Sequence, residues 1–297
     1  MKSFNRFPFA FATVLGLCAA LPLQASERIN IASGTQYDGK VETRNSPINI
    51  GDEVQINGDI ESRNGSISIG DTVSAGDVST RNGSIRIGQG GRFGQVDTRN
   101  GSISIGGQSL AQDLSSRNGN VTVGQDSELQ GQVGTRNGNI ELETGVHVHG
   151  DAKTRNGSIR MAPASTVDGN VSTRNGSADL DSAHIARNLR GWAGDLSLRN
   201  ASRVDGNVII KIRENSGGSG WCSRWRSQYT EAGNINILEG SEVGGDVIVS
   251  LPIDYDEKMP VIRIDASSRV HGNVKVDERI ELHIEGQVGG QIERISH

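Results

Sequence analysis

The chain contains few residues of the kinds that build an aromatic core or a disulfide framework. It has two cysteines, six prolines and only 4% aromatic residues. Cys18 lies in the N-terminal segment 1–25, so Cys222 has no cysteine partner in the rest of the chain. An internal disulfide network is therefore excluded as a source of stability.

The sequence also lacks an excess of positive charge and a long apolar run beyond position 25. Its formal net charge is −5, and it becomes −7 when Lys2 and Arg6 are left out. Proteins that bind nucleic acids usually have a basic balance, so no nucleic-acid partner is predicted. Without a second long apolar segment, no transmembrane segment is predicted either.

The N-terminal segment 1–25 has the organisation of a secretory signal peptide. Lys2 and Arg6 form a basic start, which is followed by the apolar stretch FPFAFATVLGLCAALPL. The tripeptide LQA at positions 23–25 is a suitable cleavage site. We therefore expect an exported protein, located in the periplasm, at the cell surface or outside the cell, whose folded domain spans residues 26–297.

Glycine and a short repeat are abundant. The chain has 40 glycines. Arg-Asn-Gly or a close variant returns along most of it with a period of about 18–19 residues. The asparagines of this repeat are Asn45, Asn64, Asn82, Asn100, Asn118, Asn137, Asn156 and Asn175. A period this short and regular is typical of a solenoid, in which each repeat is one coil stacked on the next.

Within a repeat, apolar and polar residues alternate as they do in half-buried strands. In the repeat that begins at Arg63, Ile67 and Ile69 face one side, whereas Ser66 and Ser68 face the other. Glycine-containing pairs mark the turns, because glycine, asparagine and aspartate accept the backbone angles that turns need. Each coil is thus predicted to have three short strands and three turns.

Stacked coils of this kind form a parallel β-helix with ladders of β-branched side chains in its core. One predicted ladder contains Ile48, Ile67, Ile85, Ile103, Val121, Ile140 and Ile159, and the next contains Ile50, Ile69, Ile87, Ile105, Val123, Leu142 and Met161. We predict an all-β, single-stranded, right-handed parallel β-helix (a solenoid) of about 13 coils, each of about 18–19 residues. Loop insertions are expected at residues 213–232 and 251–260, where the rhythm breaks.

Two bacterial families share features of these coils. The strings VDGNV (from Val167 and from Val204), VGGDV (from Val243) and VHGNV (from Val270) resemble the coil signature of bactofilins, which are polymer-forming β-helix proteins. The NGSIxIG strings are similar to repeats of a bacterial adhesin β-strand-repeat family. These resemblances imply a non-enzymatic envelope or surface protein that self-associates end to end.

The Arg-Asn-Gly repeat supplies two rows of candidate residues. We expect the asparagines to point inward and to form a structural hydrogen-bond ladder, with the preceding Thr or Ser packed beside them. The arginines should face outward, and the candidate ligand-binding residues among them are Arg63, Arg81, Arg99, Arg117, Arg136 and Arg155, with Arg44 and Arg174 at the ends of the row. Such a row suits an acidic glycan or lipopolysaccharide phosphates, because arginine pairs bidentately with carboxylate and phosphate.

The acidic composition favours a structural role for this Arg row, in which the arginines pair with groups of the protein itself. Close like charges repel, so they need counter-charges. Glu42, Glu61 and Asp97 each precede an arginine of the row by two positions and could neutralise it. Backbone carbonyls of the turns could also pair with these arginines. From the sequence, we favour such pairing within the protein over the binding of a polyanion by the Arg row.

Two further groups of residues are candidates. His147 and His149 alternate on a predicted strand, but without a third ligand in the sequence they predict no metal site. Trp221, Arg224, Trp225 and Tyr229 cluster in the first insertion and could bind a sugar or a protein partner.

The acidic residues are scattered, and no carboxylate pair recurs near a histidine or lysine. The sequence therefore predicts no catalytic residues, no metal and no cofactor. The leading hypothesis is a non-catalytic structural or adhesive protein of the cell envelope that self-assembles. The alternatives are a polyanion-binding module that uses the Arg row and a polysaccharide-active β-helix enzyme.

Overall fold

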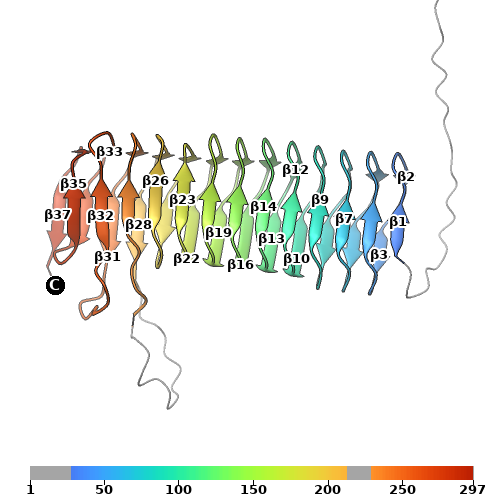
Figure 1. The fold of residues 1–297 in the computed structure, drawn as a ribbon, viewed down its shortest axis with the longest axis horizontal. Coiled ribbons are helices and arrows are strands. Elements are labelled where there is room, and N and C mark those ends of the chain that lie inside the picture. Colours follow the sequence, from blue (N-terminus) through green and yellow to red (C-terminus); the bar gives the residue numbers. More distant parts are fainter. Residues whose placement is uncertain (1–27, 213–228, 297) are drawn as a thin grey trace, which may run out of the picture.

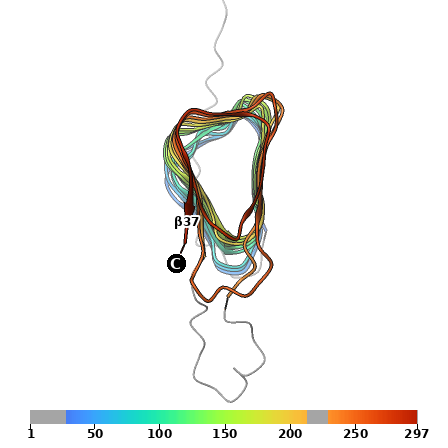
Figure 2. The ribbon, with the colours of Figure 1, turned by 90° about the vertical axis from the view of Figure 1, so that its left-hand side faces the viewer.

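The computed structural model describes residues 28–212 and 229–296, which form one straight stack of β-coils (Figure 1). All strand pairs in it are parallel, and these residues contain no helix. The predicted signal peptide and most of the first insertion lie outside the described residues. Viewed along the stack, the coils superpose as a closed outline with three sides (Figure 2).

One side of the stack is a first sheet of 13 strands. Its strands follow the glycine of each repeat and carry the predicted core ladders. In order along the stack they are β1 (Ile29–Ile31), β4 (Ile48–Ile50), β7 (Ile67–Ile69), β9 (Ile85–Ile87), β11 (Ile103–Ile105), β14 (Val121–Val123), β17 (Ile140–Leu142), β20 (Ile159–Met161), β23 (Ala178–Asp181), β26 (Leu196–Arg199), β29 (Ile235–Ile237), β32 (Val261–Ile264) and β35 (Glu281–Ile284).

The second sheet also has 13 strands, and these lead into the Arg-Asn-Gly turns. They are β3 (Val41–Thr43), β6 (Ile60–Ser62), β8 (Val78–Thr80), β10 (Val96–Asn100), β13 (Leu114–Asn118), β16 (Val133–Asn137), β19 (Ala152–Asn156), β22 (Val171–Asn175), β25 (Leu189–Gly191), β28 (Val208–Lys211), β31 (Val247–Ser250), β34 (Val274–Asp277) and β37 (Ile292–Ile295).

The third sheet is built from very short strands. They are β2 (Gln36–Tyr37), β5 (Gln55–Ile56), β12 (Leu110–Ala111), β15 (Glu128–Leu129), β18 (His147–Val148), β21 (Thr166–Val167), β24 (His184–Ile185), β27 (Arg203–Val204), β30 (Glu242–Val243), β33 (Arg269–Val270) and β36 (Gln287–Val288). Isolated bridges through Ser74 and Arg92 join β5 to β12, so this side is also continuous.

The predicted coil period and core ladders are confirmed. Ile48 pairs with Ile67, and Ile67 pairs with Ile85, so the strand register follows the sequence repeat from coil to coil. Both predicted ladders are buried throughout, with no member more than 5% exposed. The thin core is thus filled by one row of apolar side chains above another, and stability accumulates coil by coil.

The insertions lie where two paired strands of successive coils are separated by more residues than one regular repeat. Between β26 and β29 Leu196 pairs directly with Ile235, so the chain between them is much longer than one coil. Residues 251–260 separate β31 from β32 and project beyond the common outline of the coils (Figure 2). The remaining coils therefore stack without interruption on either side of these loops.

The asparagine row differs from the expectation in one respect. Its eight side chains do form a ladder, in which seven amide hydrogen bonds of 2.6–2.8 Å join each asparagine to the one in the coil before it. However, all eight side chains are exposed rather than inward. The chain turns directly after the arginine, so Arg and Asn both end outside the coil, as the exposure of Arg99 and Asn100 at the end of β10 shows.

The hydroxyl row is the inward one. From Thr80 to Thr173 each Thr or Ser before the arginine is buried and donates a hydrogen bond of 2.9–3.0 Å to the carbonyl of a glycine in the coil before it. The hydroxyl thereby satisfies a carbonyl group at a tight corner, which would otherwise lose its hydrogen-bond partner.

The glycine of the repeat is required by close approach of successive coils. A Cβ atom at Gly101 would lie 1.9 Å from the Gly83 carbonyl oxygen, and one at Gly119 would lie 2.0 Å from the Gly101 oxygen. Real Cβ atoms do not approach backbone oxygens so closely, so any other residue here forces the coils apart.

We predict that Gly101→Ala lowers the free energy of unfolding by about 1–3 kcal/mol, the usual cost of overpacking. Gly134→Ala is the matched control, because a Cβ atom there meets only the Lys153 carbonyl oxygen at 3.7 Å. It should cause no loss of stability. Chemical denaturation of both variants checks this, and equal stability of the two would contradict the close-approach argument.

Candidate functional site

The eight arginines of the repeat lie side by side on successive coils. Each of these arginines is exposed, and each directly follows a strand of the second sheet or is the penultimate residue of one. The row comprises Arg44, Arg63, Arg81, Arg99, Arg117, Arg136, Arg155 and Arg174. Neighbouring coils are about 4.8 Å apart, so the row is about 34 Å long. The parallel register therefore turns a sequence repeat into a continuous cationic stripe.

The Arg row borders two shallow hollows. The first has a volume of about 690 Å³ and is lined by Arg44, Arg63, Arg81 and Arg99 together with residues of the second sheet. The second has a volume of about 540 Å³ and is lined by the arginines and asparagines of the four coils from Arg99 to Asn156. Since both include Arg99, they form one extended surface, which we call the Arg groove.

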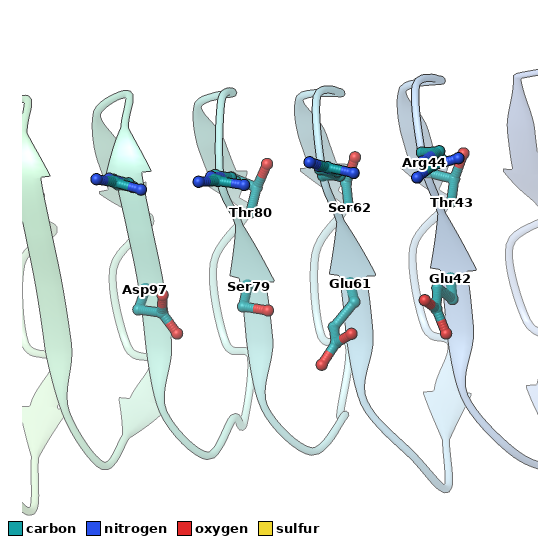
Figure 3. A pocket seen from close by; sticks show the side chains of 11 residues that line it. Glu42, Thr43, Arg44, Glu61, Ser62, Ser79, Thr80 and Asp97 are labelled. Atoms are coloured by element: carbon teal, nitrogen blue, oxygen red, sulfur yellow. The ribbon is translucent and has the colours of Figure 1, made fainter.

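The expected pairing of the Arg row with nearby acids is not observed. Among residues 28–212 and 229–296, no arginine of the row forms an ion pair. Instead, Lys40 lies 2.6 Å from a carboxylate oxygen of Glu61 and 3.3 Å from one of Glu42. The physical reason is where these side chains lie. Figure 3 shows Glu42, Glu61 and Asp97 in a row that runs across neighbouring strands, separate from the guanidinium of Arg44 near the turn.

The charge beside the Arg row changes along the stack. The outward positions of the second sheet are Glu42, Glu61, Ser79 and Asp97 in the early coils. In register with them follow Ser115, Gly134, Lys153 and Ser172 in the later coils. The acidic neighbours at this position thus stop at Asp97, and the Arg groove is most strongly positive from Arg117 to Arg155.

Asp97 is the acid most affected by this environment. Partial burial raises the pKa of its carboxyl above the ordinary value, and the negative charges of Asp77 and Glu61 raise it further. Within residues 28–212 and 229–296, no arginine forms an ion pair with it that would counteract the shift. The ionised form of Asp97 is therefore disfavoured in the folded protein.

The two candidate histidines lie on the third sheet, away from the Arg row. His147 and His149 are half-buried, and their ring centroids are 4.1 Å apart. The fold brings Asp168 and Glu128 from the adjacent coils to these rings, which sequence reasoning missed. The period of the repeat aligns position 149 with position 168, and this is the signal that the sequence offered.

Of the four candidate residues in the aromatic insertion, Tyr229 alone lies within the described residues. Trp221, Arg224 and Trp225 lie outside the described residues. Tyr229 is only 3% exposed, so it is not available to a ligand as expected. Its hydroxyl donates a hydrogen bond to Asp254, and its ring centroid lies 5.8 Å from that of Tyr255.

No protein family, curated protein or solved structure matches this chain. The residues that the structure describes include no helix of the length and apolar character needed to cross a membrane. The Arg groove is therefore interpreted from its own geometry and charge.

We predict that Asp97→Asn stabilises the protein at pH 7 and that this gain disappears below the ordinary aspartate value of 3.8. The raised pKa means that the folded state binds the proton more tightly than the unfolded state, so the wild-type protein loses stability as pH rises through the shifted pKa. Asparagine avoids this loss. Urea unfolding at both pH values measures the difference, and an equal effect at the two would contradict the assignment.

Proposed function

We propose that this protein is an exported, non-catalytic component of the bacterial cell envelope whose Arg groove binds an extended polyanion. The observation that carries this proposal is the row of exposed arginines without ion pairs among the described residues. A rigid cationic surface of this kind suits an adhesive or structural role, and the resemblance of the coils to adhesin repeats agrees with it.

The chemistry of the groove favours repeated carboxylate or phosphate groups. Each guanidinium offers a planar set of donors that can hold such a group through two parallel hydrogen bonds. The asparagines beside it are linked to one another in the ladder, so their amides form a fixed wall instead of mobile side chains. A polymer with regularly spaced anions can engage several coils at once, and linked contacts raise its overall affinity.

The later coils supply the strongest part of this surface. Gly134 and Ser172 occupy positions where the early coils have Glu42 and Glu61, so no acid repels the ligand there. Lys153 adds a further positive charge, although its amine contacts Asp151 at 2.5 Å. We therefore place the main binding segment at Arg117, Arg136 and Arg155.

The double variant Arg117→Ala/Arg136→Ala should bind polygalacturonate and polyphosphate about two- to thirtyfold more weakly than wild type, since each of the two exposed ion pairs contributes about 0.2–1 kcal/mol. Arg44→Ala/Arg63→Ala should lose less, because Glu42 and Glu61 already weaken that segment. Binding is measured by calorimetry over a salt series, and affinity should fall as salt rises.

The matched control is Arg86→Ala/Arg160→Ala, which removes the same charge from exposed positions in the centre of β9 and β20. It should leave the affinity for both polymers close to that of wild type, and neutral dextran should not bind. A loss equal to that of the groove variant would show that only net charge matters and would overturn the proposed groove.

End-to-end self-association is a second proposed function, favoured by the open C-terminal coil. Ile292 is in register with the buried core residue Val274, yet it is 50% exposed. Leu282, Ile284 and Val288 of the same coil are only partly buried. The last described coil presents a cross-section of the apolar core, and its strand edges have no further partner among the described residues, which favours stacking of a second copy.

We predict that the wild-type chain forms concentration-dependent linear assemblies and that Ile292→Lys shifts them toward monomer. A lysine in the core ladder would have to bury its charge in a stacked contact. Analytical ultracentrifugation and electron microscopy test this. Ile253→Lys serves as control, because Ile253 is 68% exposed on the loop before β32. A wild-type chain that stays monomeric at every concentration would remove the self-association proposal.

A further inference from the structure

A cluster of two histidines and two carboxylates lies on the outer face of the third sheet. His147 and His149 come from one coil, Asp168 from the next coil and Glu128 from the coil before. The Nε2 atom of His147 lies 3.1 Å from Asp168 Oδ2, and the Nδ1 atom of His149 lies 3.0 Å from the same oxygen. Two imidazole nitrogens thus converge on one carboxylate oxygen.

These distances suit a small divalent cation. The three ligand atoms of His147, His149 and Asp168 all lie within 4.8 Å of one another. In a tetrahedral zinc site, bonds of about 2.1 Å place neighbouring ligand atoms about 3.4 Å apart. The two nitrogen–oxygen separations in the cluster are a few tenths of an ångström shorter than this value. Small side-chain rotations are therefore enough to admit the ion.

The ring nitrogen of His149 that does not face Asp168, Nε2, already has the carboxylate partner that a metal-binding histidine usually has. Its Nε2 atom lies 2.9 Å from Glu128 Oε1, and the side-chain amide of Gln130 donates a 2.6 Å hydrogen bond to the same oxygen. A metal-binding histidine usually donates its second ring N–H to a carboxylate, which fixes the tautomer and the ring orientation. Glu128 fills this role, so Nδ1 of His149 is left to face Asp168.

The cluster is also accessible from solvent. His149 and Asp168 line a surface hollow with a volume of about 400 Å³. The side chains of His147 and Asp168 are 39% and 46% exposed. An ion can therefore enter without rearrangement of the coils, and solvent can occupy a fourth coordination position.

We propose that this protein binds one Zn²⁺ ion through His147 Nε2, His149 Nδ1 and the Asp168 carboxylate, with Glu128 as the positioning residue for His149. Imidazole and carboxylate together suit zinc, whereas magnesium and calcium prefer oxygen ligands alone. Because the histidines and Asp168 belong to adjacent coils, the ion cross-links the stack on the side away from the Arg groove.

A second histidine–aspartate pair on the third sheet, His184 and Asp205, lacks the other ligands that a zinc site needs. His184 Nε2 lies 2.9 Å from Asp205 Oδ2, which repeats the sequence offset between His147 and Asp168. In that coil Ala186 stands where His149 stands in the cluster, so a second imidazole is missing. Arg203 donates a 2.6 Å hydrogen bond to Asp205 and supplies the positive charge there. His184 therefore provides a matched control within the same sheet.

The test is calorimetric titration of Zn²⁺ into the tag-free chain, with Mg²⁺ as a second titrant. Wild type should bind close to one Zn²⁺ per chain and give no saturable signal with Mg²⁺. His147→Ala and His149→Ala should each weaken zinc binding by more than about tenfold, and Glu128→Gln should weaken it by about tenfold. Thermal unfolding with EDTA confirms that each variant is folded before its affinity is compared.

His184→Ala should retain wild-type affinity, because His184 does not belong to the cluster. Zinc should also raise the melting temperature of wild type and of His184→Ala, but not that of His149→Ala, since the ion binds only the folded cluster. The proposal is overturned if wild type binds no zinc, if His147→Ala and His149→Ala bind it unchanged, or if His184→Ala loses as much affinity as they do.

Discussion

The parallel hydrogen bonding between successive coils is the constraint on which the rest of this structure depends. Each backbone strand is paired with the equivalent strand one coil away, in the register of the sequence repeat wherever no loop is inserted. Every side chain is thereby placed beside its equivalent in the next coil. Any property of the repeat, apolar, polar or charged, becomes a continuous row along the stack.

The rows differ in how well they tolerate this stacking. Apolar rows gain from it, because each isoleucine covers the next and a thin core becomes continuous. Asparagine rows also gain, since an amide offers both a donor and an acceptor to its neighbours. Arginine offers donors only, so a row of arginines cannot satisfy itself and depends on water or on a ligand. The Arg row and the asparagine ladder both arise from the same turn. The asparagines satisfy their hydrogen bonds with one another, whereas the arginines do not.

The third sheet shows how the same geometry creates mixed clusters. Its strands are very short, so polar residues directly after them lie beside those of the next coil. Where these positions differ between coils, unlike groups meet, as His149 meets Asp168. The proposed zinc site thus lies where the repeat is least regular, whereas the regular part forms the core ladders and the Arg row.

The sequence by itself determined the coil length, the strands and the core ladders, because alternation together with the period of the Arg-Asn-Gly repeat leaves one arrangement that buries Ile67 and Ile85 together. Only the tertiary structure decided where side chains at the corners point. It turned Asn100 outward, directed Glu61 to Lys40 away from the arginines, buried Tyr229 against Tyr255 and joined Asp168 to the histidines. The physical reason is that alternation fixes direction only within a strand, while at a turn the direction depends on backbone angles and on contacts between coils.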